Sequence, residues 1–201
     1  MQSPQSNPSE NQRALISWRD VSAALDELIE KTQRTLDVVD QSLAFQDWGT
    51  KARCGALMVA MRERRVRVRM LIVDTQMVST ELPRLLQLLK TLGHQMTIVA
   101  APEGAFPASN FVVADQQHVL FRPNSVRSTG SLYFHNPYKS IGYAHTFEVI
   151  WQQGGRRVFP EAFGLLFRAI PVLGIWIYFR SSLSFYPGFA HRVVSTEGDS
   201  P

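Results

Sequence analysis

The sequence has little cysteine, few long uncharged apolar runs and no large excess of positive or negative charge. Its 201 residues include one cysteine, Cys54, which excludes an intramolecular disulfide and a zinc site built from several cysteines. The first residues, MQSPQSNPSENQ, have no apolar stretch of the kind found in a secretory signal, so we expect a cytoplasmic protein. The net charge of +4 is too small to indicate a polyanionic partner by itself.

The remaining composition is that of a folded chain. Hydrophobic residues make up 45% of the sequence and charged residues 19%, which allows one sizeable core at this length. We expect three regions: a disordered leader over residues 1–13, an α/β domain over 14–154, and an apolar C-terminal extension with a tail over 155–201.

Hydrophobic periodicity predicts helices that alternate with strands. Helical spacing predicts helices over 17–34, 50–63, 82–92 and 136–153, and β-branched or alternating stretches predict strands over 35–43, 65–74 and 95–100. Residues 110–115 and 118–122 form a predicted hairpin about a turn at Gln116-Gln117. This order implies an α/β fold with a mixed sheet flanked by helices on both faces.

The hairpin resembles part of a known family. Phe111-Val-Val-Ala-Asp115 and Val119-Leu-Phe-Arg122 follow strands that end Ile72-Val-Asp74 and Ile98-Val-Ala100. This pattern resembles the phospholipase D-like superfamily over about residues 15–153, as a single half-domain. The ending Phe147-Glu-Val-Ile-Trp151 is similar to a degenerate bacterial branch whose members can be joined to acyltransferase domains. The resemblance implies a homodimer, because active relatives pair two halves, and an acyltransferase or other protein as a further partner.

Most residues that perform the family's chemistry are missing. Active members present His-x-Lys-x-x-x-x-Asp at the start of this hairpin, where the His attacks phosphorus and the Lys neutralises phosphate oxygens. Counting back from Asp115 places Ala108 at the nucleophile and Asn110 at the Lys, so only the Asp remains. His135 as nucleophile and Lys139 as phosphate clamp are the available substitutes. The alternative is that both residues simply stand at the solvated start of a helix.

Three aspartates suggest a different chemistry. Asp40, Asp74 and Asp115 each follow a predicted strand, and ligand sites of open α/β sheets gather at the carboxyl ends of strands. Three converging carboxylates would hold Mg²⁺ for a metal-dependent phosphoesterase. The alternative is that each aspartate satisfies backbone donors where its strand turns into a loop.

Arginines form the clearest charge feature. Arg65, Arg67 and Arg69 share one face of a predicted strand, at a spacing of about 6–7 Å that matches successive phosphates. They predict contact with a phosphate-containing ligand, nucleic acid included. The alternative is an edge strand or a solvated strand that charge protects from aggregation.

The segment 158–179 has the length of a membrane span but contains Glu161, Arg168 and two prolines. Three interpretations stay open: a span, an interfacial or partner-binding helix with peripheral membrane association, and a packed or loosely ordered C-terminal helix. Taken together, the sequence predicts a catalytically degenerate phospholipase D-like module that binds or regulates a phosphate-containing ligand or a protein partner. The alternative is the metal-dependent phosphoesterase, and no motif indicates another cofactor.

Overall fold

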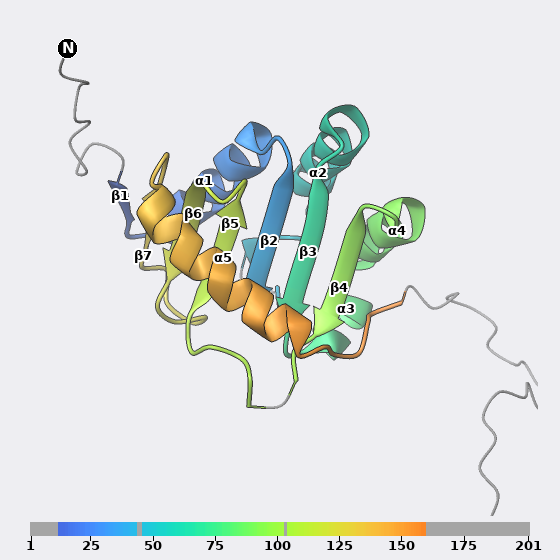
Figure 1. Cartoon of the computed structure of the whole chain (residues 1–201). Coiled ribbons are helices and arrows are strands. Elements are labelled where there is room, and N and C mark those ends of the chain that lie inside the picture. Colours follow the sequence, from blue (N-terminus) through green and yellow to red (C-terminus); the bar gives the residue numbers. More distant parts are fainter. Residues whose placement is uncertain (1–11, 44–45, 103, 160–201) are drawn as a thin grey trace, which may run out of the picture. The chain divides into compact units, whose positions relative to one another are not determined.

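A computed structural model describes residues 12–43, 46–102 and 104–159. These residues build one seven-stranded sheet with five helices (Figure 1). In chain order the elements are β1 (Gln12–Leu15), α1 (Trp18–Lys31), β2 (Thr35–Asp40), α2 (Lys51–Arg64), β3 (Arg67–Ile72), α3 (Thr75–Glu81), α4 (Pro83–Leu92), β4 (Met96–Ala100), β5 (Asn110–Ala114), β6 (His118–Arg122), β7 (Gly130–Tyr133) and α5 (Pro137–Gln152).

The sheet is mixed, as the sequence predicts. The strand order is β1-β7-β6-β5-β2-β3-β4, in which β2, β3 and β4 are parallel and all other neighbours are antiparallel. The parallel strands are joined through helices, because a parallel crossover needs a long connection. Strand β5, the first strand of the hairpin, runs antiparallel to its neighbour β2 and so opposite to all three parallel strands. This reversal decides which strand ends meet at the same edge of the sheet.

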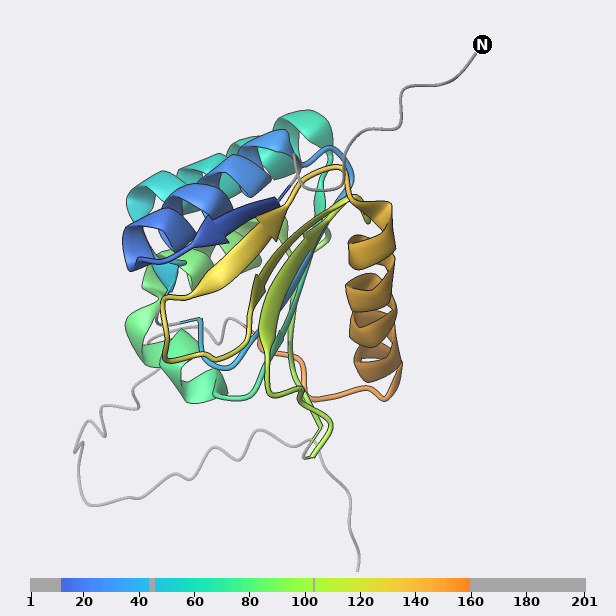
Figure 2. The same ribbon diagram turned by 90° about the vertical axis from the view of Figure 1, so that its left-hand side faces the viewer.

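Helices cover both faces of the sheet (Figure 2), and an apolar cluster lies under each. Helices α1 to α4 pack on one face, where Leu25, Leu28 and Leu85 are fully buried against alternate strand residues such as Val68 and Leu120. Of the helices that the structure describes, α5 alone crosses the other face, where Phe147 is fully buried. Burial of each such large side chain stabilises the fold by about 1.5–3 kcal/mol.

Local signals fix the helix boundaries. A capping box begins α1, in which the Ser17 hydroxyl accepts from the Asp20 N–H and the Asp20 carboxylate accepts from the Ser17 N–H. Asn136 caps α5, and Pro137 follows it at the first helical position, as predicted. These caps place the start of α5 beside the end of β7.

Several short elements differ from the predictions. Gln12 and Arg13 belong to β1, so the leader predicted over 1–13 is wrong for these two residues, and residues 1–11 lie outside the described part. Strand β7 and helix α3 are not predicted, because neither carries a regular apolar period. The hairpin turn is centred on Asp115 and Gln116, both at positive φ, one residue earlier than predicted.

The C-terminal predictions fall largely outside the described part. Residues 160–179 of the predicted apolar segment are not described, and Val158 and Phe159 are the last described residues of it. Among the helices of residues 12–159 that the structure describes, none has the length and apolar character to cross a membrane.

Candidate functional site

The start of β5, where the resemblance places the catalytic residues, is a buried polar cluster. Asn110 is 2% exposed and lies directly opposite Arg122 of β6, which is fully buried. An Arg122 Nη2 donates to the backbone carbonyls of Asn124, Ser125 and Arg127, and its Nη1 lies 4.0 Å from Asp40 Oδ2. Within the described residues, Arg122 Nε and Nη1 and Asn110 Nδ2 have no hydrogen-bond partner.

Asp40 completes this cluster. Its carboxylate accepts from the backbone N–H of Ser42 and Leu43, at 3.2 and 3.0 Å, and from the side-chain amide of Gln46. Burial raises the pKa of the Asp40 carboxyl, whereas the two N–H donors oppose that shift. Burial likewise lowers the pKa of Arg122, and Asp40 opposes it. Asp40 and Arg122 therefore act as a buried charge pair that holds the ends of β2 and β6 together.

Asp115 lies at the opposite edge of the sheet. Its carboxylate accepts three backbone hydrogen bonds, from Gln33 at 2.8 Å, Arg34 at 2.7 Å and Thr35 at 2.9 Å. Because Thr35 begins β2 and Asp40 ends it, Asp115 and Asp40 are separated by the length of the strand, about 16 Å. Asp115 thus fastens the hairpin turn to the start of β2.

The predicted three-carboxylate metal site is therefore wrong. The prediction treated the ends of β2, β3 and β5 as neighbours, but β5 runs antiparallel to β2 and delivers Asp115 to the far edge. Asp74 is exposed and caps α3, accepting from the N–H groups of Gln76 and Met77. In the described ranges, no group of three His, Cys, Asp or Glu side chains is arranged to hold a metal ion.

The three predicted phosphate-binding arginines lie in different surroundings. Arg69 binds the Asp37 carboxylate through Nε and Nη2, at 2.7 and 2.9 Å, and contacts Glu148 at 2.7 Å. Its guanidinium also lies over the Phe147 ring, 4.6 Å from the centroid. Arg69 thus joins β3 to α5 and is not free to bind phosphate in this arrangement.

Arg65 and Arg67 are exposed. Arg65 ends α2 in the left-handed conformation, and Arg67 begins β3 on the face that α5 covers further along. The edge-strand alternative is wrong for β3, which lies between β2 and β4 in the sheet.

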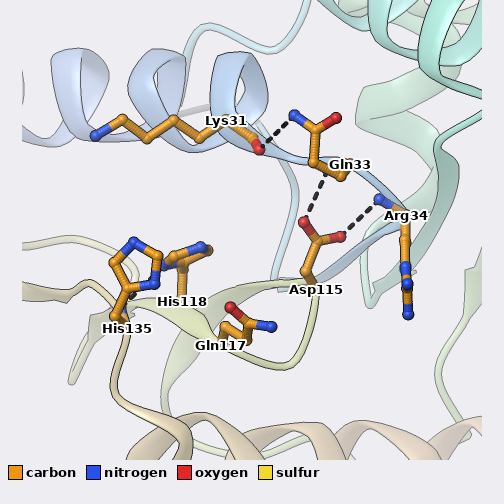
Figure 3. A pocket seen from close by; sticks show the side chains of 7 residues that line it. All are labelled: Lys31, Gln33, Arg34, Asp115, Gln117, His118 and His135. Carbon is orange, nitrogen blue, oxygen red and sulfur yellow. Dashed lines mark hydrogen bonds between the residues drawn. The ribbon is translucent and has the colours of Figure 1, made fainter.

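A pocket of about 510 Å³ opens at the same edge as Asp115 (Figure 3). The turn after α1 forms one side of it, the β5–β6 turn forms another, and the turn between β7 and α5 forms the third. Its lining residues are Lys31, Gln33, Arg34, Asp115, Gln117, His118 and His135.

Two histidines meet in this pocket. The rings of His118 and His135 are 4.6 Å apart and nearly perpendicular. The backbone N–H of His135 donates to His118 Nδ1 at 3.1 Å, so neutral His118 carries its proton on Nε2. Burial lowers the pKa of His118, and the neighbouring His135 adds to this effect. Nε2 is therefore the His118 ring nitrogen that remains available to donate.

His135 and Lys139, the substitutes considered for the lost motif, are placed by the start of α5. His135 is exposed and has a positive φ of 46°. Lys139 is exposed in the first helical turn, with Nζ 6.0 Å from the Tyr133 ring centroid, and it does not line the pocket. The structure thus brings His135 together with His118 rather than with Lys139.

Sequence reasoning missed the partnership of His118 with His135 and the buried Asp40–Arg122 pair. The two histidines are 17 residues apart, and they meet because β7 pairs with β6 and returns the chain to the start of the hairpin. Because β7 has no regular apolar period, the contact could be found only by knowing that β7 pairs with β6.

Several solved structures have a similar fold. The structure of TrmBL2, described as an archaeal chromatin protein with a novel mode of DNA binding, has a TM-score of 0.56 and 11% identity, and the match covers 76% of this chain and 56% of that one. Nuc from Salmonella typhimurium, a phospholipase D family member, has a TM-score of 0.52 and 13% identity, with coverage of 74% and 99%. Phosphatidylserine synthase from Haemophilus influenzae Rd KW20 has a TM-score of 0.50 and 11% identity, with coverage of 73% and 39%.

These likenesses show a phospholipase D-like α/β fold. This chain spans about half the length of TrmBL2 and a smaller share of the synthase. Residues 17–158 match the family described as a domain of unknown function, DUF7931, and the chain belongs to that family. No protein with a curated description matches the sequence.

Proposed function

We propose that this chain is a phospholipase D-like module that acts by binding, or by regulating a partner, without phosphodiesterase turnover. The observation that carries the proposal is Asn110. It stands where the family resemblance expects a phosphate-neutralising Lys, and it is buried opposite Arg122. Ala108, at the expected nucleophile position, has no atom that can attack phosphorus.

The surroundings of Asn110 support the same conclusion. Covalent phosphoryl chemistry needs a nucleophile held about 3–3.5 Å from phosphorus and positive charge aimed at the developing oxyanion. The neighbouring Arg122 contacts Asp40 and three backbone carbonyls and has no exposed surface. Every described histidine belongs to a segment other than the one around Ala108 and Asn110.

The experiment is a turnover assay on the full chain with bis(p-nitrophenyl) phosphate. It is run with Mg²⁺, with Mn²⁺ and with EDTA, beside the variant His135→Asn. Asparagine tolerates the positive φ of His135, so this variant removes the imidazole while keeping the backbone. We expect the buffer rate in every condition. Turnover that scales with protein and disappears in His135→Asn would replace the proposal with a histidine-dependent enzyme, and turnover that needs metal would favour a metal-dependent one.

A protein partner is the second part of the proposal, with a second copy of this chain as the partner. The outer side of α5 leaves Tyr138, Ile141 and Val149 at 94, 58 and 44% exposure. They form an apolar stripe on the one helix within the described residues that covers this face of the sheet. Light scattering on the full chain is expected to give about twice 22.7 kDa, and Ile141→Lys is expected to lower it. A mass of one chain for the unaltered protein would exclude the dimer.

The remaining partner and location predictions are also proposals. They are an acyltransferase partner, a cytoplasmic location and membrane-surface contact through 158–179. TrmBL2 is described as binding DNA, which supports including nucleic acid among the phosphate-containing ligands to be tested.

A further inference from the structure

We propose that the pocket at the Asp115 edge of the sheet binds the phosphate group of a ligand, with His118 and His135 as its donors. This inference takes one element from the proposed function, namely that the chain acts by binding a ligand. The pocket lies at the opposite end of β5 from Asn110, so it is separate from the place where the family resemblance expects chemistry.

The charge of the pocket favours an anion. Asp115 is the single acidic residue among those that line it, and its two carboxylate oxygens already accept three backbone N–H groups. A carboxylate satisfied in this way offers little to a cation, and no metal-binding group of three side chains exists among the described residues. The remaining titratable lining residues are Lys31, Arg34, His118 and His135, all basic.

Arg34 supplies the available positive charge. Its side chain is exposed, and its guanidinium makes no hydrogen bond or ion pair with any of the residues that the structure describes. Lys31 differs, because its Nζ binds Glu27 at 2.8 Å and lies 4.4 Å from the Phe134 ring centroid. Figure 3 places the Arg34 side chain on the far side of Asp115 from the two histidines, so we assign a longer-range electrostatic contribution to both Arg34 and Lys31.

The histidine pair supplies the donors. His118 Nδ1 is occupied by the His135 N–H, which leaves the Nε2–H of His118 to donate. His135 is exposed beside it, and its ring nitrogens are not used by any described residue. Helix α5 begins at Pro137, two residues after His135.

Donors that approach from separate turns suit a tetrahedral oxyanion better than a planar carboxylate, because phosphate oxygens project in several directions. The volume of about 510 Å³ is large enough for a phosphate group together with part of the molecule that carries it. All the lining residues are polar or charged, so a purely apolar ligand would leave their donors unsatisfied. The shared chemistry is thus a phosphate monoester or diester.

The experiment follows the imidazole resonances of the full chain by nuclear magnetic resonance during titration with inorganic phosphate. Separate titrations with adenosine monophosphate and with a short single-stranded oligonucleotide distinguish a monoester from a diester source, and acetate serves as the planar comparison. Three variants are compared with the unaltered protein: Arg34→Gln, His135→Asn and the matched control Arg67→Gln. Arg67 is an exposed arginine whose backbone N–H bonds to the Arg34 carbonyl, but its side chain lies on the other face of the sheet.

We expect saturable shifts of the His118 and His135 resonances with phosphate and weaker ones with acetate. His135→Asn is expected to weaken binding about tenfold, Arg34→Gln about threefold, and Arg67→Gln less than about twofold. The inference is overturned by phosphate that leaves both resonances unmoved, or by Arg67→Gln weakening binding as much as His135→Asn. Phosphate binding without turnover supports both proposals, whereas turnover with intact phosphate binding at this pocket overturns only the proposed function.

Discussion

Asp115 Oδ1 lies 2.7 Å from the backbone nitrogen of Arg34 and binds the start of β2 to the turn between β5 and β6. In the family resemblance, Asp115 is the only residue of the catalytic motif that this chain retains. Its contacts explain the retention structurally, because the carboxylate satisfies three backbone donors that would otherwise be left at the end of α1 and the start of β2.

Replacement of Asp115 should therefore lower stability. We expect Asp115→Ala to reduce the free energy of unfolding by about 2–3 kcal/mol, because it removes three charge-assisted hydrogen bonds and places alanine at a φ of 54°. Asp115→Asn keeps one acceptor oxygen and tolerates this φ, so a loss of about 1 kcal/mol is expected. Urea unfolding measures both. Equal losses, or losses below about 0.5 kcal/mol, would contradict the structural role.

Arg69 and Arg67 offer a matched pair of arginines on one strand face. Arg69→Lys breaks the two-point contact with Asp37 and is expected to destabilise the protein by about 1–2 kcal/mol. Arg67→Lys alters an exposed side chain and should change the free energy of unfolding by less than about 0.5 kcal/mol. If urea unfolding gives the same loss of unfolding free energy for both substitutions, the Arg69 contacts do not stabilise the fold more than the exposed Arg67 side chain does.

Asp40 and Asp74 provide a second matched pair at the carboxyl edge of the parallel strands. Asp40→Ala leaves Arg122 buried without its carboxylate, so we expect a loss of about 3 kcal/mol. Asp74→Ala removes an exposed helix cap, and a loss of about 1 kcal/mol is expected. Thermal and urea unfolding report the difference. A smaller effect at Asp40 than at Asp74 would argue against the buried charge pair.

The lowered pKa of His118 makes stability depend on pH. The folded-state pKa lies below the unfolded value of 6.5, so between these values the unfolded chain binds more protons. The contribution of His118 to the free energy of unfolding is therefore complete above pH 6.5. It is lost as the pH falls below 6.5 toward the folded-state pKa. Lys31, Asp115 and His135 are the charged groups that act on it.

His118→Gln should flatten this dependence. Urea midpoints measured from above neutral pH down to mildly acidic pH are expected to fall more steeply for the unaltered protein than for the variant, because glutamine does not titrate. Parallel curves for the two proteins over this range would show that His118 does not have a lowered pKa in the folded state.

Much of the fold follows from the sequence because its central elements have strong local signals. The leucine spacing predicts α4, and Asn136-Pro137 predicts the start of α5, since each signal acts within one or two helical turns. Strands β1 and β7 escape prediction because they are short and mostly polar, and their stability comes from pairing with each other.

The site is harder to predict, because its residues meet through long-range pairing. The antiparallel direction of β5 separates Asp115 from Asp40, although both residues follow strands with the same apolar pattern. The His118–His135 contact depends on β7, which the pattern does not reveal. The positions that the resemblance aligns with the family's His and Lys are different, since Ala108 and Asn110 can be identified by counting along the chain.

The central claim is that the fold is retained while phosphodiesterase chemistry is lost. The most direct measurement is the steady-state rate of bis(p-nitrophenyl) phosphate hydrolysis by a preparation whose cooperative unfolding has first been verified, with Mg²⁺, Mn²⁺ or EDTA present. The account predicts a rate equal to that of buffer in all three conditions. A rate that rises in proportion to the protein concentration and survives further purification would contradict it.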